Sequence, residues 1–325
     1  MNRRQFVRLN AAALGVVALD ACARAISVEP SGAIASLSDP ANFARARRFA
    51  ATPFGEIAYV SRGRGAAALF LHGYPLNGFQ WRGVIERLQD VRRCIAPDLM
   101  GLGYSDVPLS QAITPEAQAH MLIALLDRLG VEACDVVAND TGGLIAQLLV
   151  TRFPQRVRSL LLTNCDTQED CPPRAFQPFI ALARAGGLSD KVIAPALANK
   201  AAARSPRGLG GLGYSNPLDP TDDAIETYFA PIVSSSKRKA QFDALTIGLG
   251  RNALAGSADT LRKFQGPVRI VWGAADTVFA KTSPQWLDGI FPNSRGVRLV
   301  DGAKLFFPEE QPDVVAAEAR LLWTT

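Results

Sequence analysis

The 325-residue sequence predicts an α/β fold: a mostly parallel sheet with helices on both faces and an inserted helical cap. Short runs rich in Val, Ile and Leu alternate with amphipathic helical patterns, which is typical of a parallel sheet buried on both faces. Residues 167–262 interrupt this alternation without a convincing buried strand. One strand also runs into a turn of small residues followed by a helix, a layout that places a reactive side chain at the sheet edge.

The elements follow in order along the chain. Strands are expected at residues 57–61, 67–71, 94–96, 135–138, 159–163, 268–272 and 297–300. Helices are expected at residues 80–88, 115–129, 144–153, 283–291 and 312–323. The core then comprises residues 46–166 and 263–325, and residues 167–262 form a helical cap. Such a cap would lie over the C-terminal edge of the sheet, where α/β sheets bind ligands.

Composition and charge indicate a globular chain without a nucleic-acid partner. Hydrophobic residues make up 48% and charged residues 20%, as in ordinary globular proteins. The net charge is +5, but residues 1–25 hold four arginines and one aspartate and so contribute +3 of it, which leaves +2. No run of Lys and Arg is long enough to predict nucleic-acid binding.

Residues 1–25 have the pattern of a twin-arginine export signal. Residues 2–7 resemble the twin-arginine motif, and the apolar core at 11–19 is shorter than the roughly 20 residues that span a bilayer. A basic N-terminus without a targeting role is the alternative. Residues 19–22 resemble a lipobox with Cys22 as the lipidated residue, whereas the small residues at 21–25 would suit a signal peptidase. We therefore expect a periplasmic protein that engages the twin-arginine export machinery and contacts a membrane only if Cys22 is lipidated.

The remaining cysteines do not predict a metal site. Cys94 and Cys134 fall in apolar strand patterns and are expected to be buried thiols. Cys165 and Cys171 follow a strand and could pair in an oxidising compartment, although twin-arginine substrates usually fold before export. The spacing does not suit zinc, because there is no CxxC and the chain has only two histidines. No metal or cofactor is expected.

Asp140 is the candidate nucleophile. It lies in the turn between the apolar strand at 135–138 and the helix at 144–153, between Ala138 and Gly142. A carboxylate nucleophile forms an ester, and a general base must then activate water to release it. An aspartate in such a turn could instead cap the N–H groups of the helix. The small flanking residues favour a functional carboxylate.

Motifs in a fixed order resemble α/β-hydrolases of the epoxide hydrolase and haloalkane dehalogenase branch. The resemblance covers roughly residues 50–323, and the ordered set is much more specific than any single motif. The motifs are His72-Gly73-Tyr74-Pro75 with Trp81-Arg82, Asp98 to Ser105, the elbow at Asp140, Trp272 to Asp276, and Pro308-Glu309-Glu310-Gln311-Pro312.

The resemblance implies roles for individual residues. Asp140 would be the nucleophile, and the backbone N–H groups of Tyr74 and Thr141 would form the oxyanion hole. Asp276 would orient a catalytic histidine, or it could simply hydrogen-bond the turn that follows it. The family's histidine is expected in the turn at 302–308, where this chain has Leu305. Leucine cannot accept a proton, so the catalytic histidine is missing.

Other residues are weighed as replacements for that base. His72 begins the oxyanion loop, where the family uses a histidine structurally, and His120 is expected on a helix away from the catalytic edge. Lys304 neighbours the vacant position, but its ammonium must first lose a proton. Asp276 could activate water directly, or Asp140 and Asp276 could form an acid–base pair for isomerase or lyase chemistry.

The resemblance also bears on the substrate. Thr141 stands where related dehalogenases carry a halide-binding Trp, whereas Tyr74 resembles the aromatic residue of epoxide hydrolases. Tyr214 and Tyr228 are the cap tyrosines that would protonate an epoxide oxygen, or buried packing residues. Trp81 and Leu305 are further substrate-binding candidates.

Two classes of function follow. The first is an exported hydrolase-family enzyme that attacks a small apolar electrophile through Asp140, with water activation impaired or rerouted. The second is a non-catalytic descendant of the fold that binds an apolar ligand. The retained elbow, Tyr74 and Asp276 favour the enzyme.

Overall fold

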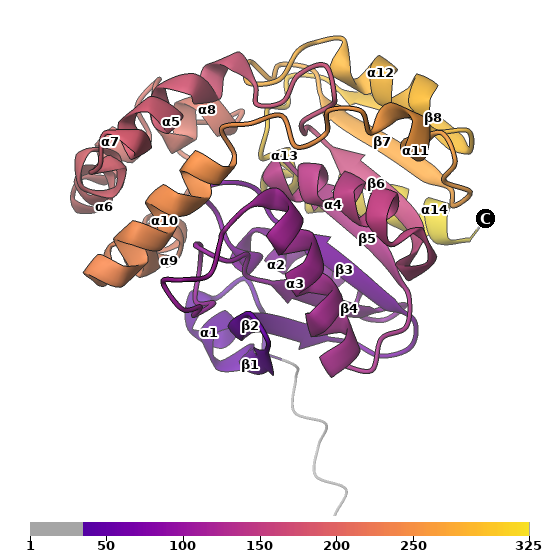
Figure 1. Ribbon diagram of the computed structural model, residues 1–325, viewed down its shortest axis with the longest axis horizontal. Helices are drawn as coiled ribbons and strands as arrows, with labels where there is room; N and C mark the ends of the chain where they lie inside the picture. Colours follow the sequence, from indigo (N-terminus) through magenta and orange to yellow (C-terminus); the bar gives the residue numbers. More distant parts are fainter. Residues whose placement is uncertain (1–34, 325) are drawn as a thin grey trace, which may run out of the picture. The chain divides into compact units, whose positions relative to one another are not determined.

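A computed structural model describes residues 35–324, and residues 36–325 form one compact unit (Figure 1). The predicted α/β class is confirmed. The predicted export signal at 1–25 and the lipidation candidate Cys22 lie outside the described residues. Within 35–324, every helix is too short or too polar to cross a bilayer.

An eight-stranded sheet forms the centre of the molecule, in the order β1-β2-β4-β3-β5-β6-β7-β8. The pairs β1–β2 and β2–β4 are antiparallel, and all the other neighbours are parallel. The strands are β1 (Arg47–Thr52), β2 (Gly55–Arg62), β3 (Ala67–Leu71), β4 (Arg93–Pro97), β5 (Cys134–Asn139), β6 (Val157–Thr163), β7 (Val268–Gly273) and β8 (Ser294–Val300). Every residue of β3 and of β5 is buried, as expected for a sheet covered on both faces.

Strand β1 was not predicted. Only Ala50 among its six residues is buried, because β1 is an edge strand that pairs with β2 alone. An edge strand of this kind lacks the apolar run by which buried strands are found. The sequence of β1 therefore has no hydrophobic pattern from which a strand could be predicted.

Helices cover both faces of the sheet. Helices α3 (Pro115–Arg128) and α4 (Thr141–Arg152) pack together on one face, and α2 (Arg82–Leu88) and α14 (Pro312–Trp323) pack together on the other (Figure 1). The helix expected from Gln80 starts as a 3₁₀ turn at Gly78–Trp81, because Asn77 caps the N–H of Phe79. The other helices of the core are α1 (Pro40–Ala46), α12 (Ser283–Ile290) and α13 (Phe307–Glu310).

The segment between β6 and β7 is helical. Helices α5 to α10 lie together to one side of the sheet, at the upper left in Figure 1, whereas α11 packs against α4. Their bounds are α5 (Gln177–Arg184), α6 (Ala194–Ala198), α7 (Lys200–Ala203), α8 (Leu209–Gly213), α9 (Asp222–Val233), α10 (Ser236–Gly248) and α11 (Ala258–Leu261).

Arg238 connects α10 to the core. Its guanidinium is buried and donates to the carbonyl oxygens of Leu102 and Gly103, at 3.0 and 2.7 Å, and to that of Ser105. These three carbonyls belong to the loop after β4. Arg238 therefore holds α10 to this loop.

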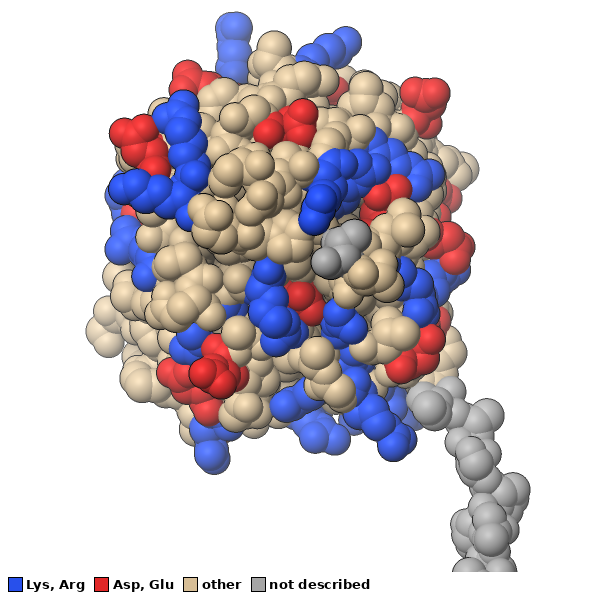
Figure 2. Space-filling view, turned by 90° about the vertical axis from the view of Figure 1, so that its right-hand side faces the viewer, with Lys and Arg blue, Asp and Glu red and all other residues tan. Residues whose placement is uncertain are grey.

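The surface carries both signs of charge. On the face shown in Figure 2, basic and acidic side chains are interspersed among uncharged ones. Inside the protein, Cys94, Cys134, Cys165 and Cys171 are buried free thiols.

Candidate active site

Asp140 occupies a strained turn between β5 and α4. Its φ of 55° and ψ of −128° make it the one non-glycine residue of the described chain with positive φ. A Cβ on Gly142 would lie 2.2 Å from the carbonyl oxygen of Leu71, and one on Gly143 would lie 2.3 Å from the Cβ of Cys165. The turn is therefore possible only with glycines after it, which gives it the geometry of a nucleophile elbow.

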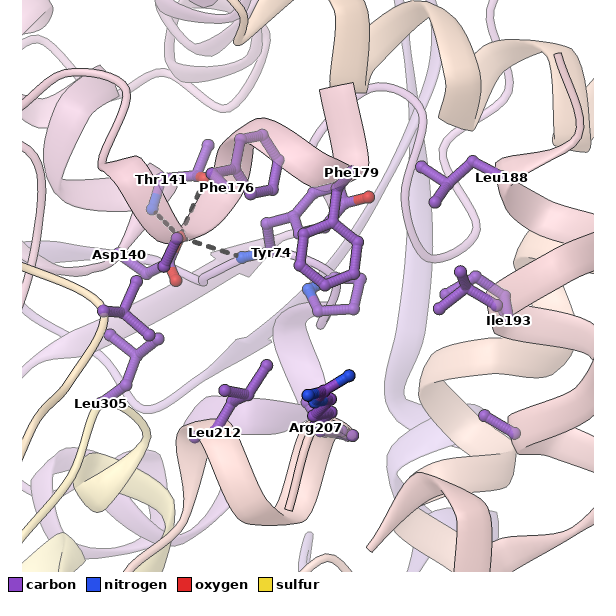
Figure 3. A pocket seen from close by; sticks show the side chains of 18 of the residues that line it. Tyr74, Asp140, Thr141, Phe176, Phe179, Leu188, Ile193, Arg207, Leu212 and Leu305 are labelled. Carbon is purple, nitrogen blue, oxygen red and sulfur yellow. Dashed lines mark hydrogen bonds between the residues drawn. The ribbon is translucent and has the colours of Figure 1, made fainter. Parts of the chain in front are cut away.

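One oxygen of the Asp140 carboxyl is fixed by hydrogen bonds. Its Oδ1 accepts from the N–H of Tyr74 at 3.3 Å, from the hydroxyl of Thr141 at 2.9 Å and from the N–H of Thr141. Figure 3 shows these bonds meeting at Asp140. Within residues 35–324 no N–H or O–H group donates to Oδ2. Burial raises the pKa of Asp140 to about 6, although these hydrogen bonds lower it.

Asp140 lies at one end of a cavity with a volume of about 330 Å³. Side chains from the turn after β8 and from the helical segment line it, with Leu305 close to Asp140 and with Leu212, Ile193 and Arg207 farther away (Figure 3). Most of the lining is apolar. It includes Phe176, Phe179, Leu188, Val192, Leu209, Phe229, Phe279 and Phe306.

Leu305 stands where the resemblance implied a histidine. It lines the cavity, and its carbonyl oxygen accepts from Nδ2 of Asn139, the residue before Asp140, at 3.0 Å. A Cβ on Gly73 would lie 2.7 Å from the Cβ of Asp140 and 2.9 Å from the ring of Phe306. The turn that carries Leu305 therefore packs closely on the elbow, with no basic group at this position.

Neither histidine lines the cavity. His72 is buried, its Nε2 accepts from the N–H of Leu99 at 3.0 Å, and its Nδ1 lies 2.9 Å from the carbonyl oxygen of Gly73. Burial lowers the pKa of His72, which favours the neutral ring in this structural role. His120 is exposed on α3, with its ring edge-on to Phe153.

Asp276 lies behind the cavity. Its carboxylate accepts from Nδ2 of Asn164 at 2.9 Å and from the N–H of Val278 at 2.8 Å, and it does not line the cavity. Burial raises its pKa. Asp140 and Asp276 do not line the same cavity, which counts against the alternative in which the two form an acid–base pair.

The prediction that three further residues bind substrate is also wrong. Trp81, Tyr214 and Tyr228 are fully buried and do not line the cavity. The hydroxyls of both tyrosines donate to Oε2 of Glu309, at 2.6 and 2.8 Å, and Trp81 packs against Phe70. Neither tyrosine can therefore protonate a substrate in this arrangement. Of the four substrate-binding candidates, only Leu305 lines the cavity.

Glu309 joins these two tyrosines to the core. Its other oxygen forms an ion pair with Arg82 at 2.8 Å, where the side chains of Arg82 and Glu309 are 16% and 4% exposed. The family-like motif at 308–312 therefore contributes a buried carboxylate that connects α8 and α9 to α2.

Sequence reasoning missed three charged residues that line the cavity. Asp166 follows β6, and Lys191 and Arg207 belong to the helical segment. Asp166 could have been found, because acidic residues directly after neighbouring parallel strands meet at one sheet edge. Lys191 and Arg207 carried no signal, since a cation in a helical insertion is usually a solvated surface residue.

The comparison with known proteins places this chain in a family. Residues 68–311 match the family model described as alpha/beta hydrolase fold, and the chain belongs to this family. A haloalkane dehalogenase 2 of Mycobacterium tuberculosis is 28% identical over 267 residues, which cover 81% of this chain and 90% of that protein. An epoxide hydrolase 2 of Siraitia grosvenorii is 38% identical over 31% of this chain and 33% of that protein.

Another relative is named for a different reaction. A cis-3-alkyl-4-alkyloxetan-2-one decarboxylase of Shewanella oneidensis is 33% identical over 36% of this chain, and the match spans only 38% of that protein. Among solved structures, the epoxide hydrolase CorEH without ligand superposes with a TM-score of 0.71 at 22% identity, covering 86% of this chain and 98% of that chain. That likeness shows the fold. The chain is thus a hydrolase-fold enzyme related to epoxide hydrolases and dehalogenases.

Proposed function

We propose that this enzyme opens small apolar electrophiles, epoxides first among them, through Asp140 as a covalent nucleophile. The observation that carries the proposal is the Asp140 carboxyl: Oδ1 is held by Tyr74 and Thr141, and Oδ2 is left without a donor in the described chain, beside an apolar cavity. A carboxylate fixed in this way attacks carbon through the other oxygen and forms an alkyl ester.

Epoxides are favoured over alkyl halides by the cavity lining. In related dehalogenases tryptophan N–H groups stabilise the leaving halide, and no tryptophan lines this cavity within residues 35–324, so a halide is expected to leave more slowly here. The epoxide oxygen remains attached to the substrate and needs a proton instead. Release of the ester then requires activated water, and Leu305 cannot activate it. Water activation is therefore impaired or rerouted to another group.

The test is covalent capture. Purified protein is mixed with a panel of epoxides and bromoalkanes, and its intact mass is measured before the modified peptide is mapped. A stable adduct on Asp140 would show a nucleophile that lacks a base, and Leu305→His is then expected to release the product. Rapid product formation without an adduct would show that another residue supplies the base. Neither adduct nor product would favour the alternative, a ligand-binding descendant without catalysis.

The rate of alkylation is expected to rise with pH and to reach half its maximum near pH 6. Only ionised Asp140 attacks, and burial raises the pKa of Asp140 to about 6. Each pH unit below that value should slow the reaction about tenfold. Rapid-quench alkylation by 1-bromobutane measures this ionisation alone, because bromide leaves without a proton. A flat profile between about pH 5 and pH 8 would contradict the assignment.

A second candidate reaction needs no water. The relative from Shewanella oneidensis is named a decarboxylase of alkyl-substituted oxetan-2-ones, which are four-membered lactones. Attack of Asp140 on C4 would break the C4–O bond and free a carboxylate on C3. Loss of CO₂ from C3 would then form the C3=C4 double bond and expel Asp140 unchanged. Leu305 favours this reaction, because the cycle closes without a base. A cis-dialkyl lactone should then give an alkene and no adduct.

A further inference from the structure

Asp166 is the second carboxylic acid that lines the cavity. Strands β5 and β6 are parallel neighbours in which Asn139 lies opposite Thr163, so Asp140 and Asp166 both follow the same edge of the sheet. Among the described residues that line the cavity, these two are the only carboxylic acids. The cavity is therefore lined by an aspartate on the elbow and by an aspartate after the next strand.

The segment that carries Asp166 is fixed against the elbow. The N–H of Asp140 donates to the carbonyl oxygen of Asn164 at 2.7 Å, and Nε2 of Gln147 on α4 donates to the carbonyl oxygen of Asp166 at 2.8 Å. Cys165 packs so closely on Gly143 that a Cβ there would clash. The position of Asp166 relative to Asp140 is thus set by the fold.

The two carboxyls have different surroundings. Asp140 accepts three hydrogen bonds from Tyr74 and Thr141, which stabilise its charge. Asp166 interacts with the thiol of Cys171 and with its own backbone N–H, and it forms no ion pair within residues 35–324. Burial and the charge of Asp140 raise the pKa of Asp166 well above its usual range. Of the two carboxyl groups, Asp166 is therefore the one whose surroundings favour the protonated form.

We infer that Asp166 is the proton-transfer residue of this site and does the work of the histidine whose position Leu305 occupies. The inference rests on the proposed function, because it requires an alkyl ester on Asp140. One carboxyl group serves both halves of the cycle: its acid form is needed when the epoxide opens, and its carboxylate form is needed when the ester is hydrolysed.

The cycle balances for an epoxide. Oδ2 of Asp140 forms a bond to the epoxide carbon, the C–O bond breaks, and the alkoxide takes the proton of Asp166. The carboxylate of Asp166 then takes a proton from water, and the hydroxide attacks Cγ of the Asp140 ester. The tetrahedral oxyanion accepts hydrogen bonds from the N–H groups of Tyr74 and Thr141. Its collapse expels the second alkoxide, which takes the proton of the new Asp140 carboxyl. The diol leaves, and Asp166 is again protonated.

The test is the fate of the ester in Asp166→Asn, a substitution that keeps the shape of the side chain. With 1-bromobutane, whose bromide needs no proton, the variant is expected to alkylate Asp140 at the wild-type rate. With styrene oxide, ring opening should slow, and the ester that forms should be hydrolysed about 10²- to 10⁴-fold more slowly. Normal alkylation by the bromide also shows that the variant is folded. Asp301→Asn, at an exposed position on the turn after β8, is the matched control.

A second substitution tests whether Asp166 acts as the base. Leu305→His added to Asp166→Asn should restore hydrolysis of the ester, since it supplies a base at the family's position. Hydrolysis at the wild-type rate in Asp166→Asn would overturn the inference about Asp166 alone, and so would a stable ester in the wild-type protein. An absence of both adduct and product in every variant would instead overturn Asp140 as the nucleophile, so the two failures are distinguishable.

Discussion

Replacing Asp140 with asparagine is expected to abolish the covalent adduct and to lower product formation by more than about 10³-fold. An amide oxygen is a far weaker nucleophile than a carboxylate. The asparagine side chain would still fill the elbow, because an amide has nearly the same size and shape as the carboxyl group that it replaces. Intact-mass measurement with 1-bromobutane and styrene oxide reads the adduct directly.

The Asp140→Asn substitution is not expected to unfold the protein. In the folded state the pKa of Asp140 is raised from 3.8 to about 6, so the ionised carboxyl costs stability, and this cost is fully present above pH 6. Asp140→Asn removes the buried charge and should melt at the same or a higher temperature at pH 7. Asp140→Ala is the companion variant, because asparagine at the elbow could slowly hydrolyse back to aspartate. An adduct elsewhere in the chain with undiminished turnover would refute the assignment.

Replacing Glu309 with glutamine is expected to lower the free energy of unfolding by about 3 kcal/mol. Glu309 is the buried partner of Arg82 and accepts from the hydroxyls of Tyr214 and Tyr228. Glutamine keeps the volume but removes the negative charge, which leaves the largely buried Arg82 guanidinium without compensation. Urea denaturation followed by circular dichroism measures the change.

An exposed ion pair supplies the matched control for Glu309. Glu226 pairs with Lys200 at 2.8 Å, and its side chain is 58% exposed. Glu226→Gln should change the free energy of unfolding by less than about 1 kcal/mol, because solvent screens the pair. An equal decrease in the free energy of unfolding in the two variants would show that burial does not increase the contribution of the Arg82–Glu309 pair to stability.

The sequence predicted the buried part of the fold and missed its edge. Strands such as β3 and β5 are buried throughout and were predicted to within a residue or two. The order of the motifs also located the elbow, because its glycines are required by contacts that any residue with a Cβ would break. Strand β1 has one buried residue, and a strand of this kind leaves no periodic signal.

The backbone groups that lie beside Asp140 could be predicted from the sequence. The directions of the side chains in the helical segment could not. The amides of Tyr74 and Thr141 lie beside Asp140, as the resemblance implied. The direction of a tyrosine cannot be read from its place in a cap, and both Tyr214 and Tyr228 point to a buried carboxylate. Asp166 was overlooked because the family's motifs assign no role to its position.

The bonds of Arg238 have a consequence for how substrate enters and product leaves. Because this side chain ties α10 to three carbonyls of the loop after β4, α10 cannot swing away from the core without breaking all three bonds. Much of the wall of the cavity comes from residues 188–213. This segment is bonded to the core near its C-terminal end, where the N–H of Phe306 and Nζ of Lys304 donate to carbonyl oxygens of α8. The part before α8 takes part in none of these bonds to the core, so we expect substrate and product to pass on that side of the cavity and not by displacement of α10.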